Sequence, residues 1–167
     1  RKMTGWRPHE RKAMNWGYSL HDFLELCKEV GSEPWYVIPP TFSPEELRNL
    51  SAYLCAPTSS NHPYALKRAA LGQEEPWTTV FPKIHLEYGN ELWGAASGSD
   101  PFFGASMLGG KRLGRVAHDR FNILRSGPYF DSAKLSLIIG GQNGSPDRQS
   151  EIMDEATSHD PIALAPY

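Results

Sequence analysis

The chain has 167 residues, 40% of them hydrophobic and 22% charged, which is enough apolar content for one packed core and too much for a disordered chain. Its formal net charge is −2, so no global basic field exists to hold nucleic acid or an anionic membrane surface. No run of about 18 apolar residues occurs, and the basic first twenty residues lack the apolar stretch of a signal peptide. We therefore expect neither nucleic acid nor a membrane as a partner.

The cysteine and histidine content argues against a metal site and against a disulfide framework. The two cysteines, Cys27 and Cys55, are too few and too far apart for a zinc knuckle. Both lie in helix-like stretches, so we interpret them as buried thiols. The six histidines show no HExxH or other metal-ligand spacing. We expect no metal ion and no cofactor.

From Ser19 onward, helix patterns alternate with short apolar runs. Ser19 and Asp22 match a capping box, and the apolar residues that follow recur with the 3.6-residue helical period. This pattern predicts a helix over residues 20–30, for which Gly31 is a suitable end. The apolar run at 33–40 then predicts a strand.

A second helix follows this strand directly. Ser43 and Glu46 form another capping box, with Pro44 at the first helical position. Residues 56–79 are rich in proline, serine and polar groups, and we interpret them as an extended connection over the surface. Within it, the stretch 64–71 could form one or two helical turns.

The second half of the chain repeats the alternation of strands and helices. Residues 84–91 predict a strand, and a glycine-rich loop over 94–110 leads into an amphipathic helix that closes near Gly127. Three further elements follow: a strand at 134–141, a helix that begins at Ser145, and a last strand at 161–167.

Four strands separated by helices indicate an α/β chain with a mostly parallel sheet. Two of the runs, 33–40 and 134–141, are apolar on both faces, as is typical of strands covered by other layers. Periodicity leaves open whether the sheet is open or closed into a barrel. A complete (β/α)8 barrel takes about 250 residues, so a chain with about four of eight strands would be a partial TIM barrel.

The strand at 84–91 carries the polar residues that point to a site. Side chains alternate along a strand and form two sets: Ile84, Leu86 and Tyr88 toward the helices, and His85, Glu87, Gly89 and Glu91 away from them. Burying unpaired polar groups is costly, so polar side chains on an interior face suggest a site or its surroundings. Glu91 would lie at the carboxyl end of the strand, where barrel folds place their active sites.

The motif at the end of this strand resembles a known group of enzymes. Gly89-Asn90-Glu91, followed by Leu-Trp-Gly and preceded by IHLEY, is similar to the fourth strand of the clan of retaining glycoside hydrolases with (β/α)8 barrels. Within that clan the likeness is greatest to the α-L-arabinofuranosidase family. The upstream segments YSLHDFLELCKEVGSEPWYVIPP and SPEELRNLSAYL are similar to that family's second helix, third strand and third helix.

The resemblance covers residues 17–167 and implies an architecture. Residues 1–167 would be part of a catalytic barrel, equivalent to its strands 3 to 6, without the C-terminal part of the barrel. One departure concerns the third strand, because Pro39, Pro40 and Thr41 stand where the relatives carry an Asn-Gly type turn. This departure leaves open which sugar the chain would bind.

The resemblance also implies roles for individual residues. Glu91 would be the general acid/base, and Asn90 would donate to the 2-hydroxyl of the sugar. Trp93 would border the sugar, and Tyr167, at the end of the presumed sixth strand, would face the same pocket. His85, on the same strand face as Glu91, is a further candidate for substrate binding, with a hydrogen-bonded interior histidine as the alternative.

A retaining glycosidase needs a second carboxylate, about 5 to 5.5 Å from the acid, to attack the anomeric carbon. The resemblance places that nucleophile at the end of the seventh strand, and this chain reaches the sixth. Glu87 lies a full pleat below Glu91, and Glu151 and Glu155 belong to a predicted helix. We therefore expect the segment by itself to be inactive.

The predicted function is a retaining glycoside hydrolase that removes arabinofuranosyl or related residues from plant polysaccharides by double displacement. Its partner would be a carbohydrate substrate. Two alternatives stay open: a non-catalytic carbohydrate-binding or scaffold barrel, and an endo-glycanase or xylosidase of the same clan. Part of a barrel also exposes unpaired strand edges, so an oligomer is possible.

Overall fold

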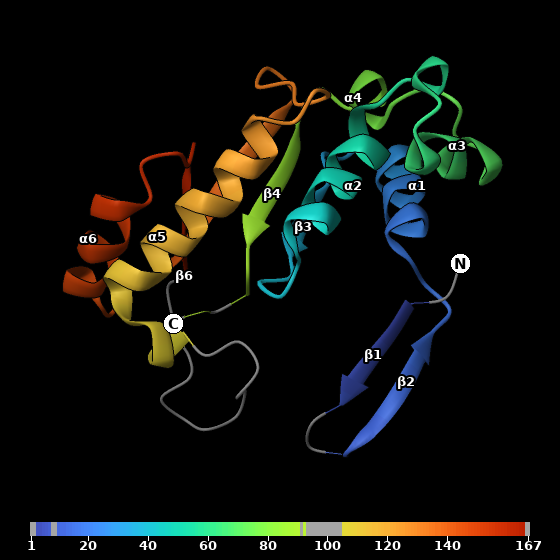
Figure 1. Cartoon of the computed structure of the whole chain (residues 1–167). Helices are drawn as coiled ribbons and strands as arrows, with labels where there is room; N and C mark the ends of the chain where they lie inside the picture. The colour runs from blue at the N-terminus through green and yellow to red at the C-terminus, as the bar shows by residue number, and fades with distance from the viewer. Residues whose placement is uncertain (1–2, 8–9, 91, 93–104, 166–167) are drawn as a thin grey trace.

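The computed structural model describes residues 3–7, 10–90, 92 and 105–165. It contains an antiparallel hairpin of two strands, β1 (Met3–Arg7) and β2 (Lys12–Trp16), which projects away from the helices in Figure 1. The sequence did not predict this hairpin. Its turn holds Arg11 in the left-handed region, with a φ of 49°, and lacks the Asn-Gly or Asp-Gly pair that usually signals a hairpin.

The remaining strands form one parallel sheet in chain order. It consists of β3 (Trp35–Ile38), β4 (Ile84–Tyr88), β5 (Leu135–Gln142) and β6 (Ile162–Ala165). Every neighbouring pair is parallel, with Trp35 opposite His85 and His85 opposite Ser136. The predicted α/β class and the four parallel strands are therefore confirmed.

The two predicted capping boxes are both formed. Helix α1 (Leu20–Val30) begins at Ser19, whose side chain accepts from the backbone of Asp22, and ends at Gly31 with a φ of 71°. Helix α2 (Pro44–Cys55) begins at Ser43 in the same way. These helix starts are set by contacts three residues apart, so the sequence shows them directly.

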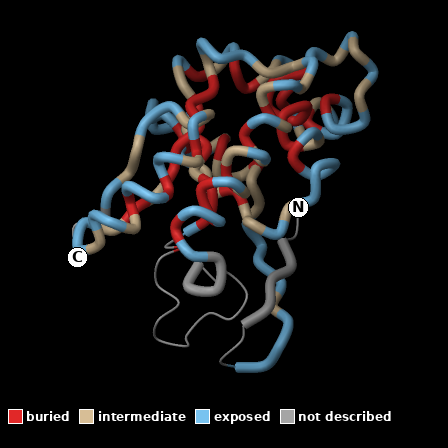
Figure 2. Tube along the Cα trace, turned by 60° about the vertical axis from the view of Figure 1, so that its left-hand side comes forward, coloured by how far each residue is buried: buried red, intermediate tan, exposed pale blue. Residues whose placement is uncertain are grey.

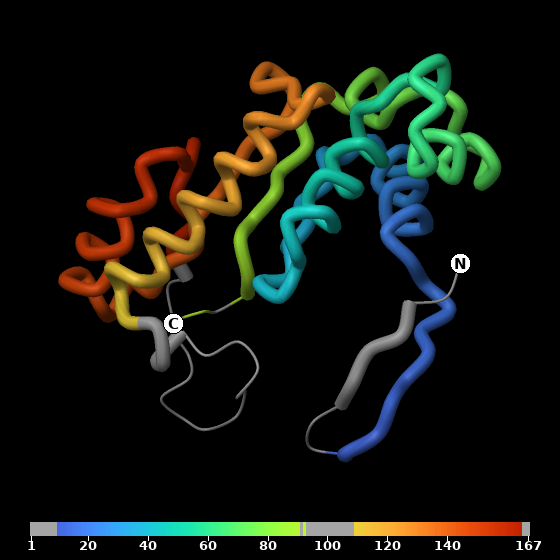
Figure 3. Tube along the Cα trace, in the orientation of Figure 1, coloured from blue at the N-terminus to red at the C-terminus, as the bar shows by residue number. Residues whose placement is uncertain are grey.

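The segment that follows α2 contains the helical turns that we predicted at 64–71, but it is more helical than the extended connection that we expected around them. It forms η1 (Thr58–Ser60), α3 (Pro63–Ala70) and α4 (Trp77–Val80), and Figure 3 traces this path from α2 to β4. The Arg68 side chain, which is 0% exposed, donates to the carbonyls of Tyr53, Ala56, Gln73 and Glu74. These hydrogen bonds fold the segment onto α2, and neither composition nor periodicity reveals them.

The last two helices pack against each other. Helix α5 (Ala105–Arg125) begins inside the predicted glycine-rich loop and has a non-helical residue, Gly109, near its start. Helix α6 (Pro146–Glu155) approaches so closely that a Cβ on Gly114 would lie 2.4 Å from the carbonyl oxygen of Ile152. The guanidinium of Arg115 also pairs with Glu155 at 2.9 Å.

The core lies between the sheet and these helices, where Figure 2 shows the buried residues concentrated. Its largest members include Leu24 on α1, Leu86 on β4 and Phe121 on α5. Cys27 and Cys55 are buried free thiols, which confirms their interpretation. Among the described helices, none has the length and apolar character that crossing a membrane requires.

Candidate functional site

Strand β4 has one apolar face and one polar face, as its sequence predicts. Ile84, Leu86 and Tyr88 are buried against the helices, and His85 and Glu87 on the opposite face are only partly buried. We call this opposite face of the sheet the inner face. The strand register places Trp35 of β3 and Ser136 of β5 on it, on either side of His85.

Two polar contacts connect neighbours on the inner face. The indole N–H of Trp35 donates to Oε2 of Glu87 at 2.8 Å. Nε2 of His85 lies 2.9 Å from Oε2 of Glu33, just before β3. The Trp35 and His85 rings lie 5.4 Å apart between centroids, so one aromatic pair lies between the two carboxylates.

Burial changes the acidity of Glu87. Removal of water around its carboxyl group raises the pKa above the ordinary value, and the hydrogen bond from Trp35 opposes this rise in part. Desolvation is the larger effect. The inner face therefore holds a carboxyl group that keeps its proton at higher pH than a solvated glutamate does.

His85 lies toward the amino end of β4 rather than at its carboxyl end. At about 3.3 Å per residue, it is roughly 10 Å from Tyr88, the last residue of the strand. Its Nδ1 is buried and has no hydrogen-bond partner among the described residues. The sequence proposed His85 for substrate binding, and the structure places it beside Glu33 and Trp35, which that reasoning missed.

Only the pairing of β3 with β4 could have revealed these two partners. Glu33 and Trp35 lie 52 residues before His85 and Glu87, respectively, and no motif joins them in the sequence. A signal exists for Trp35 alone. It lies two residues before Val37 on a predicted strand, and this spacing would place both side chains on one face.

A tight turn follows β4 at the carboxyl edge of the sheet. Gly89 has a φ of 71°, and its N–H donates to the carbonyl of Ile38 on β3 at 2.9 Å. A Cβ at this position would lie 2.4 Å from Cδ1 of Leu92, so both conformation and space require glycine. Asn90 follows as an exposed residue at this edge.

The other predicted site residues, Glu91, Trp93 and Tyr167, lie outside the described residues. Leu92, which the structure does describe, is connected to α6, because Nη2 of Arg148 donates to its carbonyl at 3.4 Å. Leu92 is itself buried. Gly89 is thus connected to β3, and Leu92 is connected to α6.

The described part of the chain contains no group of three histidine, cysteine, aspartate or glutamate side chains that could hold a metal ion. The chemistry available there is that of carboxyl, imidazole and amide groups. Such groups bind, orient and exchange protons with a polar substrate.

Comparison with known proteins gives a structural likeness but no sequence match. No protein-family model matches the sequence, and no curated protein matches it. The fold is similar to the crystal structure of the alpha-L-arabinofuranosidase from Thermotoga maritima in complex with arabinose, with a TM-score of 0.73 and 20% sequence identity. The match covers 97% of this chain and 30% of that chain.

This likeness shows that the two chains share a fold. It supports a shared α/β architecture over 97% of this chain. The chain spans 30% of the length of the solved enzyme, so the activity of that whole enzyme does not transfer with the fold.

Proposed function

We propose that this chain forms part of the catalytic domain of a retaining glycoside hydrolase, similar to the α-L-arabinofuranosidases. Its substrates would be arabinose-bearing plant polysaccharides or their oligosaccharides. The observation that carries the proposal is that Gly89 and Asn90 follow β4 directly at the carboxyl edge of a parallel sheet, with Glu91 next in the sequence. Active sites of barrel enzymes are built at this edge.

In this proposal Glu91 protonates the departing glycosidic oxygen. As a carboxylate, it then activates the water that releases the covalent intermediate. The nucleophile is a carboxylate outside the 167 residues. Asn90 donates to the sugar's 2-hydroxyl, a contact that strengthens as positive charge develops on the ring. Trp93 and Tyr167 border the sugar.

In this proposal, the polar contacts on the inner face stabilise the part of the site next to the carboxyl edge. The Glu33–His85 and Trp35–Glu87 pairs lie along the inner face, before the carboxyl edge. In the proposal, they hold the lower part of the site in place. The proposal also includes a direct contact between His85 and the sugar. The substrate would then extend along the inner face as far as His85.

The proposal includes closure of the sheet into a (β/α)8 barrel, with β3 to β6 as its strands 3 to 6. Strands β3 and β6 are the two edges of the described sheet. Unpaired edges promote association. The 167-residue chain alone should therefore elute as an oligomer in size-exclusion chromatography. A cooperatively melting monomer would contradict closure.

The test of catalysis is Glu91→Gln in the full-length protein, with α-L-arabinofuranosides as substrates. Loss of a general acid/base should lower kcat by about 10²- to 10⁴-fold, with less effect on substrates that have activated aryl leaving groups. Substrate affinity should be retained. Glu45→Gln, at an exposed position on α2, is the matched control and should leave kcat unchanged.

Two outcomes would contradict the proposal. Unchanged turnover in Glu91→Gln would remove the acid role. Saturable sugar binding without turnover in the unaltered full-length protein would instead indicate a non-catalytic carbohydrate-binding barrel. Preference for xylosides or internal linkages in a substrate screen would keep the mechanism and replace the arabinofuranosidase assignment.

A further inference from the structure

A cavity of about 310 Å³ is lined by residues of α1, α2 and α3. Tyr36 contributes to its wall from the helix-covered face of β3, opposite to the inner face. The cavity therefore lies on the other side of the sheet from the inner-face contacts of the proposed catalytic site. Its size falls at the lower end of the range for small-molecule pockets.

Four aromatic rings contribute to the wall. Tyr36, Phe42, Tyr53 and Tyr64 all line the cavity, and each comes from a different element or loop. Flat ring faces of this kind pack against the apolar C–H faces of cyclic ligands. Such walls require a ligand with at least one apolar face.

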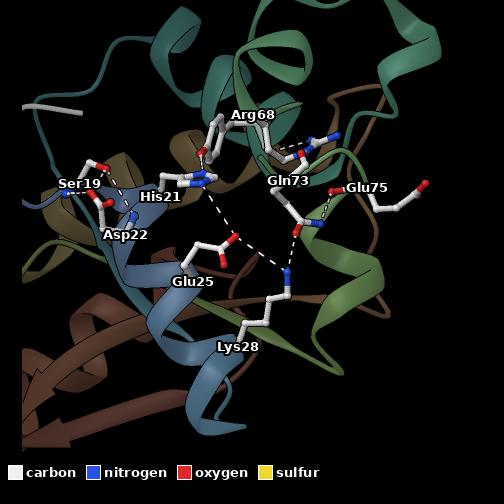
Figure 4. Close-up of polar contacts among 9 residues, drawn as sticks. Ser19, His21, Asp22, Glu25, Lys28, Arg68, Gln73 and Glu75 are labelled. Atoms are coloured by element: carbon white, nitrogen blue, oxygen red, sulfur yellow. Dashed lines mark hydrogen bonds and ion pairs between the residues drawn. The ribbon is translucent and has the colours of Figure 1, made fainter. Parts of the chain in front are cut away.

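The wall is held in place by hydrogen bonds behind it. The Tyr53 hydroxyl lies 2.7 Å from Nδ1 of the buried His21. Figure 4 shows further polar contacts that link α1 to the segment after α3: Lys28 lies 3.0 Å from Gln73, which donates to the carbonyl of Glu75. These contacts connect α1 to α2 and to the segment that follows α3.

Two neutral polar groups in the lining have no partner in the described protein. No hydrogen bond is formed by the Tyr36 hydroxyl or by the Asn49 side-chain amide among the described residues. Burial also raises the pKa of Tyr36, so its hydroxyl stays protonated and can donate. The Asn49 amide can both donate and accept. An entirely apolar ligand would leave both groups unpaired.

The charges of the lining offset each other. Lys67 lies over the Tyr64 ring at 5.5 Å, and Glu46 accepts from the backbone of Ser43 in the capping box of α2. One cation and one carboxylate give no net field that would select a charged ligand. The lining thus combines aromatic faces, neutral hydrogen-bonding groups and balanced charge.

We propose that this cavity is an accessory binding site for a single neutral sugar ring. The tyrosine and phenylalanine rings pack on the apolar face of the sugar, and the Tyr36 hydroxyl and the Asn49 amide bond its hydroxyls. The inference comes from the chemistry of the lining and stands independently of the proposed catalytic function.

The test is a titration of the ¹⁵N-labelled chain with L-arabinose and with D-xylose, followed by NMR chemical shifts. Saturable shifts should appear at the cavity residues, with dissociation constants in the millimolar range that is typical of one ring with few hydrogen bonds. Tyr36→Phe and Asn49→Ala each remove one hydrogen bond and should weaken binding by about three- to tenfold. Asn122→Ala on the exposed side of α5 is the matched control and should bind as the unaltered chain does.

A substitution that fills the cavity with a side chain gives a second test of sugar binding. Asn49→Trp places a large side chain at the half-buried position and should abolish the shifts, while the amide spectrum elsewhere reports that the fold is kept. Glu91→Gln should leave this binding unchanged, which separates it from the proposed catalytic site. The proposal is overturned by the absence of saturable shifts up to about 100 mM sugar, an affinity too weak for a specific site. It is also overturned if binding persists in Asn49→Trp or is lost in Glu91→Gln.

Discussion

On the helix-covered face of β4, Ile84 and Leu86 are fully buried, whereas His85 and Glu87 on the inner face are polar and partly exposed. The two sets belong to the same five-residue strand and differ only in the direction in which they point. The helix-covered face stabilises the fold by excluding water. The inner face instead places hydrogen-bonded polar groups next to each other, which is the arrangement that a binding site needs.

The largest effect should come from the helix-covered face. Leu86→Ala removes a fully buried side chain and should lower the free energy of unfolding by about 2–5 kcal/mol, because it leaves a cavity in the core. The neighbouring Glu87→Ala should cost less than about 1 kcal/mol, since that side chain is partly exposed. Urea unfolding of the two variants measures both values. Equal losses would contradict the distinction between the faces.

A smaller loss of stability is expected from a substitution in the turn that follows β4. Gly89→Ala should lower the free energy of unfolding by at least about 1 kcal/mol, because alanine is strained at positive φ and its Cβ would meet Leu92. Gly144→Ala is the control: no atom lies within 4 Å of its Cβ position, and its φ is not positive. Thermal unfolding compares the pair, and a stable Gly89→Ala variant would contradict the turn geometry.

The smallest effect concerns the acidity of Glu87 on the inner face. Trp35→Phe removes the N–H that lowers the pKa of this carboxyl group, so the pKa should rise further above its ordinary value. A carboxyl whose pKa is raised by folding contributes stability in its protonated form, which is lost as the pH rises through the folded pKa. The free energy of unfolding of Trp35→Phe should therefore fall, relative to the unaltered chain, as the pH increases through that pKa.

Carbon-detected NMR of the Glu87 carboxyl measures this pKa directly. The added substitution Glu87→Gln should abolish the pH-dependent difference between the Trp35→Phe and unaltered backgrounds. A lower pKa in Trp35→Phe would show that the indole acts on Glu87 mainly by excluding water. That outcome would contradict the role of the hydrogen bond.

Much of the fold could be predicted from short-range patterns. The capping boxes at Ser19 and Ser43 act over three residues, and the alternation along β4 repeats every two residues. Both are therefore visible in the sequence. The position of the Gly-Asn-Glu motif after an apolar strand was predictable for the same reason, and so was the parallel α/β class.

The contacts across the sheet could not be predicted in this way. The pairing of Trp35 with Glu87 depends on the register of β3 against β4, and 52 residues separate the two side chains. The same holds for Arg68, whose carbonyl partners come from both sides of α3. These hydrogen bonds fold a segment with the composition of a surface loop onto α2.

The sequence by itself determined where α1 and α2 begin, which side chains share a face of β4, and which residues follow that strand at its carboxyl end. Only the tertiary structure decided that Glu33 and Trp35 contact His85 and Glu87, and that a cavity lies between α1, α2 and α3. The physical reason is the range of the forces. Backbone geometry and capping act between near neighbours, whereas pairing, burial and cavities depend on which distant segments pack together.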